Sequence, residues 1–246
     1  MQKCKRQNCD VDDTLWHNET YYLETGASFK QLLAAYVRPE EIERVLGEIE
    51  IRNVALYGYG IKSYTLSMLE AAIALTGGRI TGKEMRQILE LGQEMLRAEV
   101  RLFEAAEPTL AELARAYDLM LITKGDLLEQ GNKVTRSGLQ NYFRHVEIVQ
   151  DKTAASYRRL LERHGILPAQ FIMVGNSLRS DILPVLEIGA RAVYIPYQHT
   201  WAHERVAESD LLQRNYYELE TLAQLPALLA RLDDEQDGWF GTVKRK

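Results

Sequence analysis

Short, mainly apolar runs alternate with helical segments through the second half of the chain. The runs cover residues 119–122, 146–149, 171–174 and 192–195. Each has the length of one strand buried on both faces, and a helical pattern over residues 154–164 separates two of them. This alternation predicts an α/β protein with a parallel sheet covered by helices on both faces.

Residues 28–100 show helical periodicity instead. Pro39 suits the first position of a helix, and Thr81 stands three residues before Glu84, which is the spacing of a capping box. Thr109 has the same relation to a glutamate and predicts the start of a later helix. The apolar stripes of this region predict a small helical subdomain with its own core.

Residues 56–62 lie between two of these predicted helices and contain two glycines beside aromatic residues. An ordinary helix–helix turn explains the glycines, but a loop that touches a ligand is also compatible with them. In the second case Tyr59 and Lys62 are candidate substrate contacts. Lys124, which follows a predicted strand, is a further candidate, although a solvated lysine is an equal alternative.

The segment 10–16, DVDDTLW, places two carboxylates two residues apart. Residues i and i+2 of an extended backbone point to the same side, so Asp10 and Asp12 are expected to project together from a strand end. Chemistry in which one carboxylate attacks and another moves a proton needs this arrangement. The residues before Asp10 are polar, however, whereas a buried strand favours apolar residues. The sequence leaves open whether residues 1–9 form the first strand.

The polar residues that interrupt the apolar pattern fall at or just after the ends of the predicted strands. They are Asp10, Asp12, Thr123, Lys124, Lys152, Asn176 and Asp181. The carboxyl ends of parallel strands lie along one edge of a sheet, where ligands bind. Carboxylate and amide oxygens suit Mg²⁺, and a lysine with a hydroxyl suits phosphoryl oxygens.

The overall composition excludes several classes of function. The chain has 246 residues, a net charge of −5 and no apolar run long enough to span a bilayer, so neither a nucleic-acid nor a membrane role is expected. Cys4 and Cys9 predict free thiols, and residues 1–9 are polar and basic without the apolar region of a secretory signal, so a cytoplasmic protein is expected. His199, His203 and Glu204 do not match a helical zinc motif, so we predict that the two histidines lie at the surface.

These motifs together resemble those of the haloacid dehalogenase-like hydrolases. The four motifs of that family correspond to DVDDTLW at Asp10, the run ending in Thr123, Lys152, and the segment 175–181, GNSLRSD. The resemblance implies a Rossmann-like three-layer core, residues 1–16 and 106–246, with an α-helical cap, residues 17–105, inserted after the first strand. The family's fourth motif more often begins Gly-Asp, and the amide of Asn176 supplies no charge to a metal.

The resemblance also implies roles for individual residues. Asp10 would be the nucleophile, and Asp12 would protonate the leaving group and then activate water. Thr123 and the Gly125 amide would bind the phosphoryl group, and Lys152 would neutralise it. The implied Mg²⁺ ligands are Asp10, Asp12 through its carbonyl, Asn176 and Asp181.

The expected activity is therefore the Mg²⁺-dependent hydrolysis of a small phosphorylated metabolite. Family members that cleave carbon–halogen bonds lack an acid at the position of Asp12, which favours phosphate esters here. A phosphomutase and a catalytically idle binding protein on the same fold remain alternatives.

Overall fold

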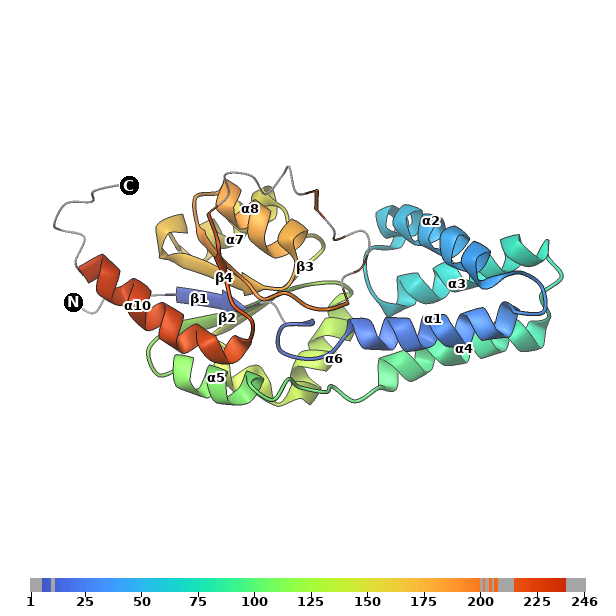
Figure 1. Cartoon of the computed structure of the whole chain (residues 1–246), viewed down its shortest axis with the longest axis horizontal. Helices are drawn as coiled ribbons and strands as arrows, with labels where there is room; N and C mark the ends of the chain where they lie inside the picture. The colour runs from blue at the N-terminus through green and yellow to red at the C-terminus, as the bar shows by residue number, and fades with distance from the viewer. Residues whose placement is uncertain are drawn as a thin grey trace.

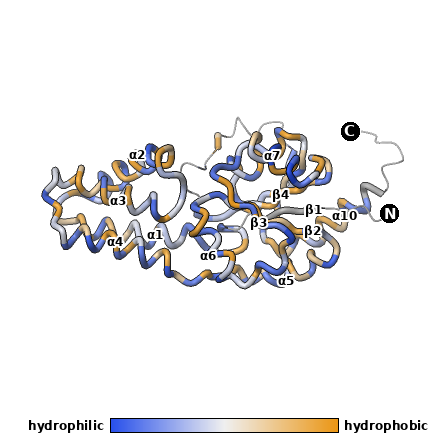
Figure 2. The backbone as a smooth tube through the Cα atoms, turned by 180° about the vertical axis from the view of Figure 1, so that it is seen from behind, coloured by the Kyte–Doolittle hydropathy of each residue, from blue (hydrophilic) through white to orange (hydrophobic). Residues whose placement is uncertain are grey.

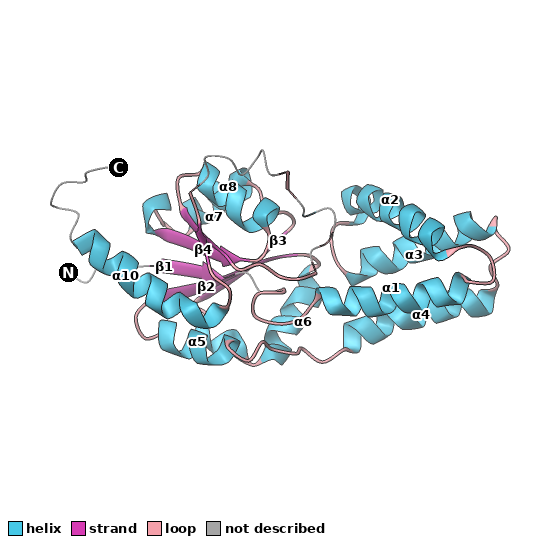
Figure 3. Ribbon diagram, viewed as in Figure 1, coloured by secondary structure: helices cyan, strands magenta, loops and turns pink. Residues whose placement is uncertain are grey.

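The computed structural model describes residues 6–9, 12–199, 201, 204, 206–207 and 215–237. In this part of the chain, six parallel strands form one sheet in the order β3-β2-β1-β4-β5-β6 (Figures 1 and 3). The strands are β1 (Arg6–Cys9), β2 (Asp118–Lys124), β3 (His145–Val149), β4 (Phe171–Gly175), β5 (Arg191–Tyr194) and β6 (Tyr217–Glu218). The predicted parallel sheet is confirmed, and each of the four apolar runs supplies one of its strands.

The polar N-terminal segment forms a strand at the centre of this sheet. β1 pairs with β2 on one side and with β4 on the other, so that Gln7 lies opposite both Leu119 and Ile172. The question that the composition left open is thus answered by the flanking strands. Two neighbouring ladders offer hydrogen bonds to both edges of β1, and this tertiary context outweighs the low strand preference of its residues.

Helices cover both faces of the sheet, as the figures show (Figure 1). Leu119 and Leu121 of β2 face a cluster that includes α5 (Ala106–Leu113), α6 (Leu127–Ser137) and α10 (Leu225–Asp237). Met120 and Ile122 face the opposite cluster, which includes α7 (Ala154–Arg163) and α8 (Leu183–Glu187). Successive side chains of a strand point to opposite faces, so this division defines a three-layer, Rossmann-like core. Short 3₁₀ turns lie at Leu139–Tyr142, Pro168–Gln170 and Leu222–Gln224, and a π-helical turn at Leu178–Ile182.

Four helices between β1 and β2 pack around a separate hydrophobic cluster. They are α1 (Glu19–Leu33), α2 (Pro39–Tyr57), α3 (Ile61–Thr76) and α4 (Gly82–Arg97). Phe29, Met68 and Ile88 are fully buried in this cluster. Polar and apolar stretches alternate along the backbone of these helices (Figure 2). The four helices lie together at one end of the molecule (Figure 1). We call them the helical unit. They fall within the segment predicted as a cap, whose boundaries and role stay predictions.

The structure agrees with the predicted helix starts at Pro39 and Thr81 and differs from the one predicted at Thr109. α2 begins at Pro39, and Thr81 forms a complete capping box with Glu84 at the start of α4. The predicted start at Thr109 is wrong, because α5 begins three residues earlier, at Ala106. Pro108 then occupies the first turn, where its missing N–H removes no intrahelical hydrogen bond. None of the described helices is long and apolar enough to cross a lipid bilayer.

Candidate active site

A cavity of about 500 Å³ lies where the carboxyl ends of the strands meet the helical unit. The sheet supplies one end of its wall, and α1, α2 and α3 supply the other. Several of the residues predicted for the site line it together. They are Asp12, Tyr59, Thr123, Lys124, Lys152 and Asn176. The ends of the strands therefore bring most of the expected side chains to one cavity. Asp10 and His203 lie outside the described residues.

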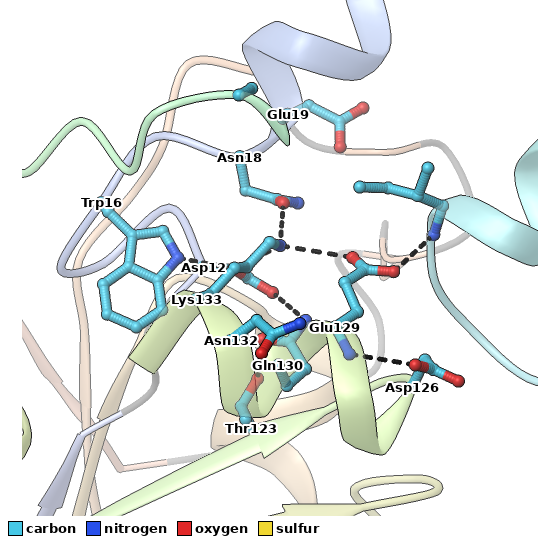
Figure 4. A network of polar contacts seen from close by, with 12 residues as sticks. Asp12, Trp16, Asn18, Glu19, Thr123, Asp126, Glu129, Gln130, Asn132 and Lys133 are labelled. Atoms are coloured by element: carbon cyan, nitrogen blue, oxygen red, sulfur yellow. Dashed lines mark hydrogen bonds and ion pairs between the residues drawn. The ribbon is translucent and has the colours of Figure 1, made fainter. Parts of the chain in front are cut away.

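The carboxylate of Asp12 is held by three donors (Figure 4). Its Oδ1 accepts hydrogen bonds from Trp16 Nε1 at 2.8 Å and from Lys133 Nζ at 3.2 Å. Its Oδ2 accepts one from Gln130 Nε2 at 3.0 Å. The side chain is 20% exposed, so it remains open to the cavity while its orientation is fixed.

Helix α6, which follows β2, supplies a polar network that the sequence analysis missed (Figure 4). Lys133 contacts Asn18 Oδ1 at 2.7 Å and Glu129 Oε1 at 3.5 Å, in addition to Asp12. Burial acts to lower the pKa of Lys133, but the charges of Asp12 and Glu129 raise it overall, so the lysine stays protonated. Glu129, Gln130 and Lys133 are spaced i, i+1 and i+4 near the start of a helix that follows a strand end. This spacing, which places the side chains within about one helical turn, is the feature of the sequence from which the network could have been predicted.

Glu129 also joins α6 to the helical unit. Its Oε2 accepts the backbone N–H of Ile61, the first residue of α3, at 2.8 Å. Gly60 has φ +118°, and a Cβ there would lie 2.8 Å from this same oxygen. The segment 56–62 is therefore a helix–helix turn that also borders the cavity, through Tyr59 and both of its glycines.

Asp13 fixes the start of the helical unit. Its backbone has φ 57°, and its carboxylate accepts hydrogen bonds from the N–H groups of Asn18 and Glu19 at 2.9 and 3.1 Å. Asparagine and aspartate tolerate this left-handed conformation better than other non-glycine residues. Burial, opposed in part by these hydrogen bonds, raises the pKa of Asp13 to about 7. The carboxylate of Asp13 thus holds the first residues of α1 at the cavity.

Lys152 and Asp181 form a buried ion pair of 2.8 Å, and their side chains are 2% and 0% exposed. The second oxygen of Asp181 accepts the N–H of Ser177 at 3.0 Å. Asp181 does not line the cavity, whereas Lys152 does. Direct coordination of a metal by Asp181 stays a prediction, and in the described conformation both of its oxygens already accept hydrogen bonds.

Gly175, at the end of β4, is required by this ion pair. A Cβ at this position would lie 2.4 Å from Asp181 Oδ2. We expect Gly175→Ala to reduce the free energy of unfolding by about 1–3 kcal/mol, measured by urea denaturation, because the carboxylate must shift. Gly131→Ala is the matched control, since no atom lies within 4 Å of its Cβ in α6. That substitution should stabilise by up to about 1 kcal/mol. Equal effects at both positions would contradict the prediction.

Thr123 and Lys124 end β2 at the cavity wall. The Thr123 hydroxyl donates to Gln130 Oε1 at 3.3 Å, so Gln130 bridges Thr123 and Asp12. The Lys124 ammonium is ion-paired with Glu204 and lies 4.4 Å from the centre of the Tyr59 ring. Lys124 is therefore not an isolated, solvated lysine.

Glu204, which the sequence analysis considered only as part of a weak zinc motif, lines the cavity. It accepts hydrogen bonds from Lys124, Ser177 and Ser180. Burial acts to raise the pKa of Glu204, but the charge of Lys124 and these hydrogen bonds lower it to about 2. Its carboxylate therefore balances the charge of Lys124.

Two predicted substrate contacts are engaged elsewhere. The Gly125 amide donates to the Val149 carbonyl at 3.2 Å, and Lys62 forms an ion pair of 2.7 Å with Asp126. Neither residue is among those that line the cavity. Their sequence positions, beside Thr123 and beside the glycine turn, gave no information about these local partners.

The donor atoms at the sheet end of the cavity suit a hard cation. Asn176 Oδ1 accepts only a long hydrogen bond from Thr14 among the described contacts, at 3.4 Å, and Asp12 lines the same cavity. Within the described ranges, no three His, Cys, Asp or Glu side chains converge as a metal site. A complete oxygen site would need a further carboxylate, and Asp10 is the residue that stands two positions before Asp12.

The structure has a Rossmann-like core with a cavity at the carboxyl ends of its parallel strands, and the comparisons with known proteins agree with this fold. The sequence model of the haloacid dehalogenase-like hydrolase family matches residues 9–189. The chain therefore belongs to this family. The predicted resemblance is confirmed, and the protein is a hydrolase.

Individual relatives have named activities. A haloacid dehalogenase-like family hydrolase from Xanthomonas campestris is 35% identical, with a TM-score of 0.84 over 95% of this chain and 94% of that one. Human N-acylneuraminate-9-phosphatase is 26% identical over 83% of this chain and 84% of its own. Glyceraldehyde 3-phosphate phosphatase from Pyrococcus furiosus is 30% identical, but the match spans only 55% of this chain and 56% of that protein.

Proposed function

We propose that the protein is a Mg²⁺-dependent phosphatase that hydrolyses small phosphomonoesters through an aspartyl phosphate. The observation that carries the proposal is the orientation of Asp12 by Trp16, Gln130 and Lys133 in a cavity that Thr123 and Lys152 also line. The named activities of the human and Pyrococcus furiosus relatives support a phosphomonoester as substrate.

In the first step Asp10 attacks phosphorus, and the bond from phosphorus to the ester oxygen breaks. Asp12 donates a proton to that departing oxygen. In the second step Asp12 removes a proton from water, which attacks phosphorus and releases phosphate from Asp10. The contacts of Asp12 support this role, because they orient the carboxylate and leave it partly open to the cavity.

The remaining residues bind and neutralise the phosphoryl group. Thr123 offers a hydroxyl, and Lys152, which Asp181 holds in place, offers a buried positive charge. The groups that would hold Mg²⁺ are Asp10, the carbonyl of Asp12, Asn176 and Asp181, and the ion would shield the negative charge of the phosphoryl oxygens. The helical unit would act as a cap that covers the cavity and excludes water.

Release of inorganic phosphate from p-nitrophenyl phosphate tests the proposal. We expect turnover in the presence of Mg²⁺ and its loss when EDTA removes the metal, with recovery when Mg²⁺ is added in excess. A panel of alkyl phosphate esters covers the case in which the cap rejects an aryl group. A folded protein that releases no phosphate from any ester, or that does so equally in EDTA, would contradict the proposal.

A further inference from the structure

The cavity extends well past the strand ends into the helical unit. This inner end is formed by α1, α2 and α3, and its polar residues include Glu19, Tyr22, Glu50, Ser63 and Tyr64. The proposed chemistry uses none of them. We call these five residues the inner subsite.

Two carboxylates of the inner subsite lack a positive partner. Among the described residues, neither Glu19 nor Glu50 accepts a side-chain hydrogen bond or forms an ion pair. Burial, with the neighbouring charges of Asp13 and Glu50, raises the pKa of Glu19 to about 8. Burial alone raises the pKa of Glu50 to about 7. Lys30 lines the same cavity, but its ammonium pairs with Glu43 at 3.2 Å.

The hydroxyl groups of the inner subsite point independently to a ligand. Tyr64 and Ser63 are each only 6% exposed, and both line the cavity. In the part of the chain that the structure describes, neither side-chain hydroxyl has a hydrogen-bond partner. The Tyr64 hydroxyl lies against α1, since a Cβ on Gly26 would be 3.3 Å from it. Buried hydroxyls are normally paired, so these two are available to a bound molecule.

Aromatic rings complete the inner subsite. The rings of Tyr22 and Tyr64 lie with their centres 5.0 Å apart and tilted by 56°. Both tyrosines are close enough to Glu19 and Glu50 for these charges to raise the tyrosine pKa values further. Carboxylates beside aromatic faces are the groups with which proteins bind organic cations.

We propose that the inner subsite binds a protonated amino group on the leaving-group part of the substrate, so that the preferred esters are phosphates of amino alcohols or amino sugars. The inference rests on the proposed phosphatase function. An ammonium group donates hydrogen bonds to both carboxylates and offsets their mutual repulsion, which a neutral hydroxyl does not do. A leaving group that carries a carboxylate would add a further negative charge and is disfavoured.

The distribution of charge in the cavity agrees with such a substrate. Lys124, Lys133 and Lys152 all belong to the sheet end, where the phosphoryl group would bind. The unpaired carboxylate of Glu50 belongs to α2, within the helical unit, and Glu19 begins α1 close to Asp13. An ester with a phosphate at the sheet end and an ammonium between these two carboxylates matches this order.

The test measures binding of phosphonates, which cannot be hydrolysed. Isothermal titration calorimetry with Mg²⁺ compares ω-aminoalkylphosphonates of increasing chain length with their ω-hydroxy counterparts. At the optimal length the wild type should bind the amine about tenfold more tightly or better, as expected for charge-assisted hydrogen bonds. Glu50→Gln and Glu19→Gln should each remove most of this preference, and Tyr64→Phe should reduce it.

Glu48→Gln is the matched control, because it removes the same charge from the same helix at a position that does not line the cavity. This variant should keep the preference of the wild type, and melting temperatures establish that every variant is folded. Equal binding of amine and hydroxyl at every chain length, or a preference that survives both Glu50→Gln and Glu19→Gln, would overturn the inference.

Phosphate release from p-nitrophenyl phosphate is measured on the same samples and separates the two proposals. Turnover without an amine preference would overturn the inner subsite and leave the phosphatase proposal intact. An amine preference without turnover of any ester would support the amino-group site and contradict the phosphatase proposal.

Discussion

Asp10→Asn and Asp12→Asn are each expected to lower the rate of phosphate release by about a thousandfold or more, because each removes a carboxylate that takes part in bond making or proton transfer. Trp16, Gln130 and Lys133 hold the Asp12 carboxylate at the cavity, and an amide in its place keeps the shape but cannot deliver a proton. Asp10 stands two residues before Asp12 in the sequence, after the central strand β1, and this is the position of the nucleophile in the proposed reaction.

The two substitutions should differ in their dependence on the leaving group. A p-nitrophenolate ion leaves without help from an acid, whereas an alkoxide does not. Asp12→Asn should therefore reduce the turnover of an alkyl phosphate more than that of p-nitrophenyl phosphate, and Asp10→Asn should reduce both equally. The measurement is kcat for both esters with saturating Mg²⁺.

Asp118→Asn provides the control for charge removal. Asp118 is the first residue of β2, at the amino end of the strand and away from the cavity, and it pairs with Arg144. It should leave kcat within about twofold of the wild type. A value of kcat for Asp12→Asn within tenfold of the wild type on the alkyl ester would show that Asp12 is not the acid. Retained turnover in Asp10→Asn would remove Asp10 as the nucleophile.

The sequence predicts most of the sheet because its signals are local. The apolar runs that become β2, β4 and β5 contain residues buried on both faces, and their composition reflects that burial. The run that becomes β3 lies at the edge of the sheet and is only partly buried. β1 is different, since Arg6–Cys9 has no such composition and is a strand because β2 and β4 pair with it. A single segment does not reveal the hydrogen bonds that its future neighbours will offer.

The same contrast holds for the candidate site. Thr123, Lys152 and Asn176 are predictable because the end of a parallel strand is a defined place in the fold. Two partners of Asp12, Gln130 and Lys133, cannot be predicted in this way. They reach Asp12 from a helix more than a hundred residues further along the chain. The substrate contacts of the Gly125 amide and Lys62 stay predictions. In the structure each group meets a partner, Val149 or Asp126, that the local sequence does not disclose.

Lys152→Met is expected to reduce the free energy of unfolding by about 3–5 kcal/mol, which is a large fraction of the stability of a typical domain. Lys152 and Asp181 contact each other at 2.8 Å with almost no exposure to solvent. Removal of the ammonium leaves the Asp181 carboxylate fully buried, with the N–H of Ser177 as its remaining described partner. The cost is the desolvation of an uncompensated charge rather than the loss of one contact.

A double-variant cycle tests this explanation by urea denaturation in EDTA, so that bound metal does not contribute to stability. Lys152→Met combined with Asp181→Asn should recover much of the lost stability, because no buried charge then remains unpaired. Arg44→Met is the surface control, since Arg44 and Glu48 form an ion pair of the same 2.8 Å length with side chains 59% and 65% exposed. Loss of that pair should cost less than about 1 kcal/mol. Two results would contradict this explanation. One is a loss of unfolding free energy in Lys152→Met no larger than in Arg44→Met, and the other is a double variant less stable than either single variant. In either case, burial of the pair is not the cause of its contribution to stability. The position of Lys152 would then depend on its other contacts rather than on Asp181.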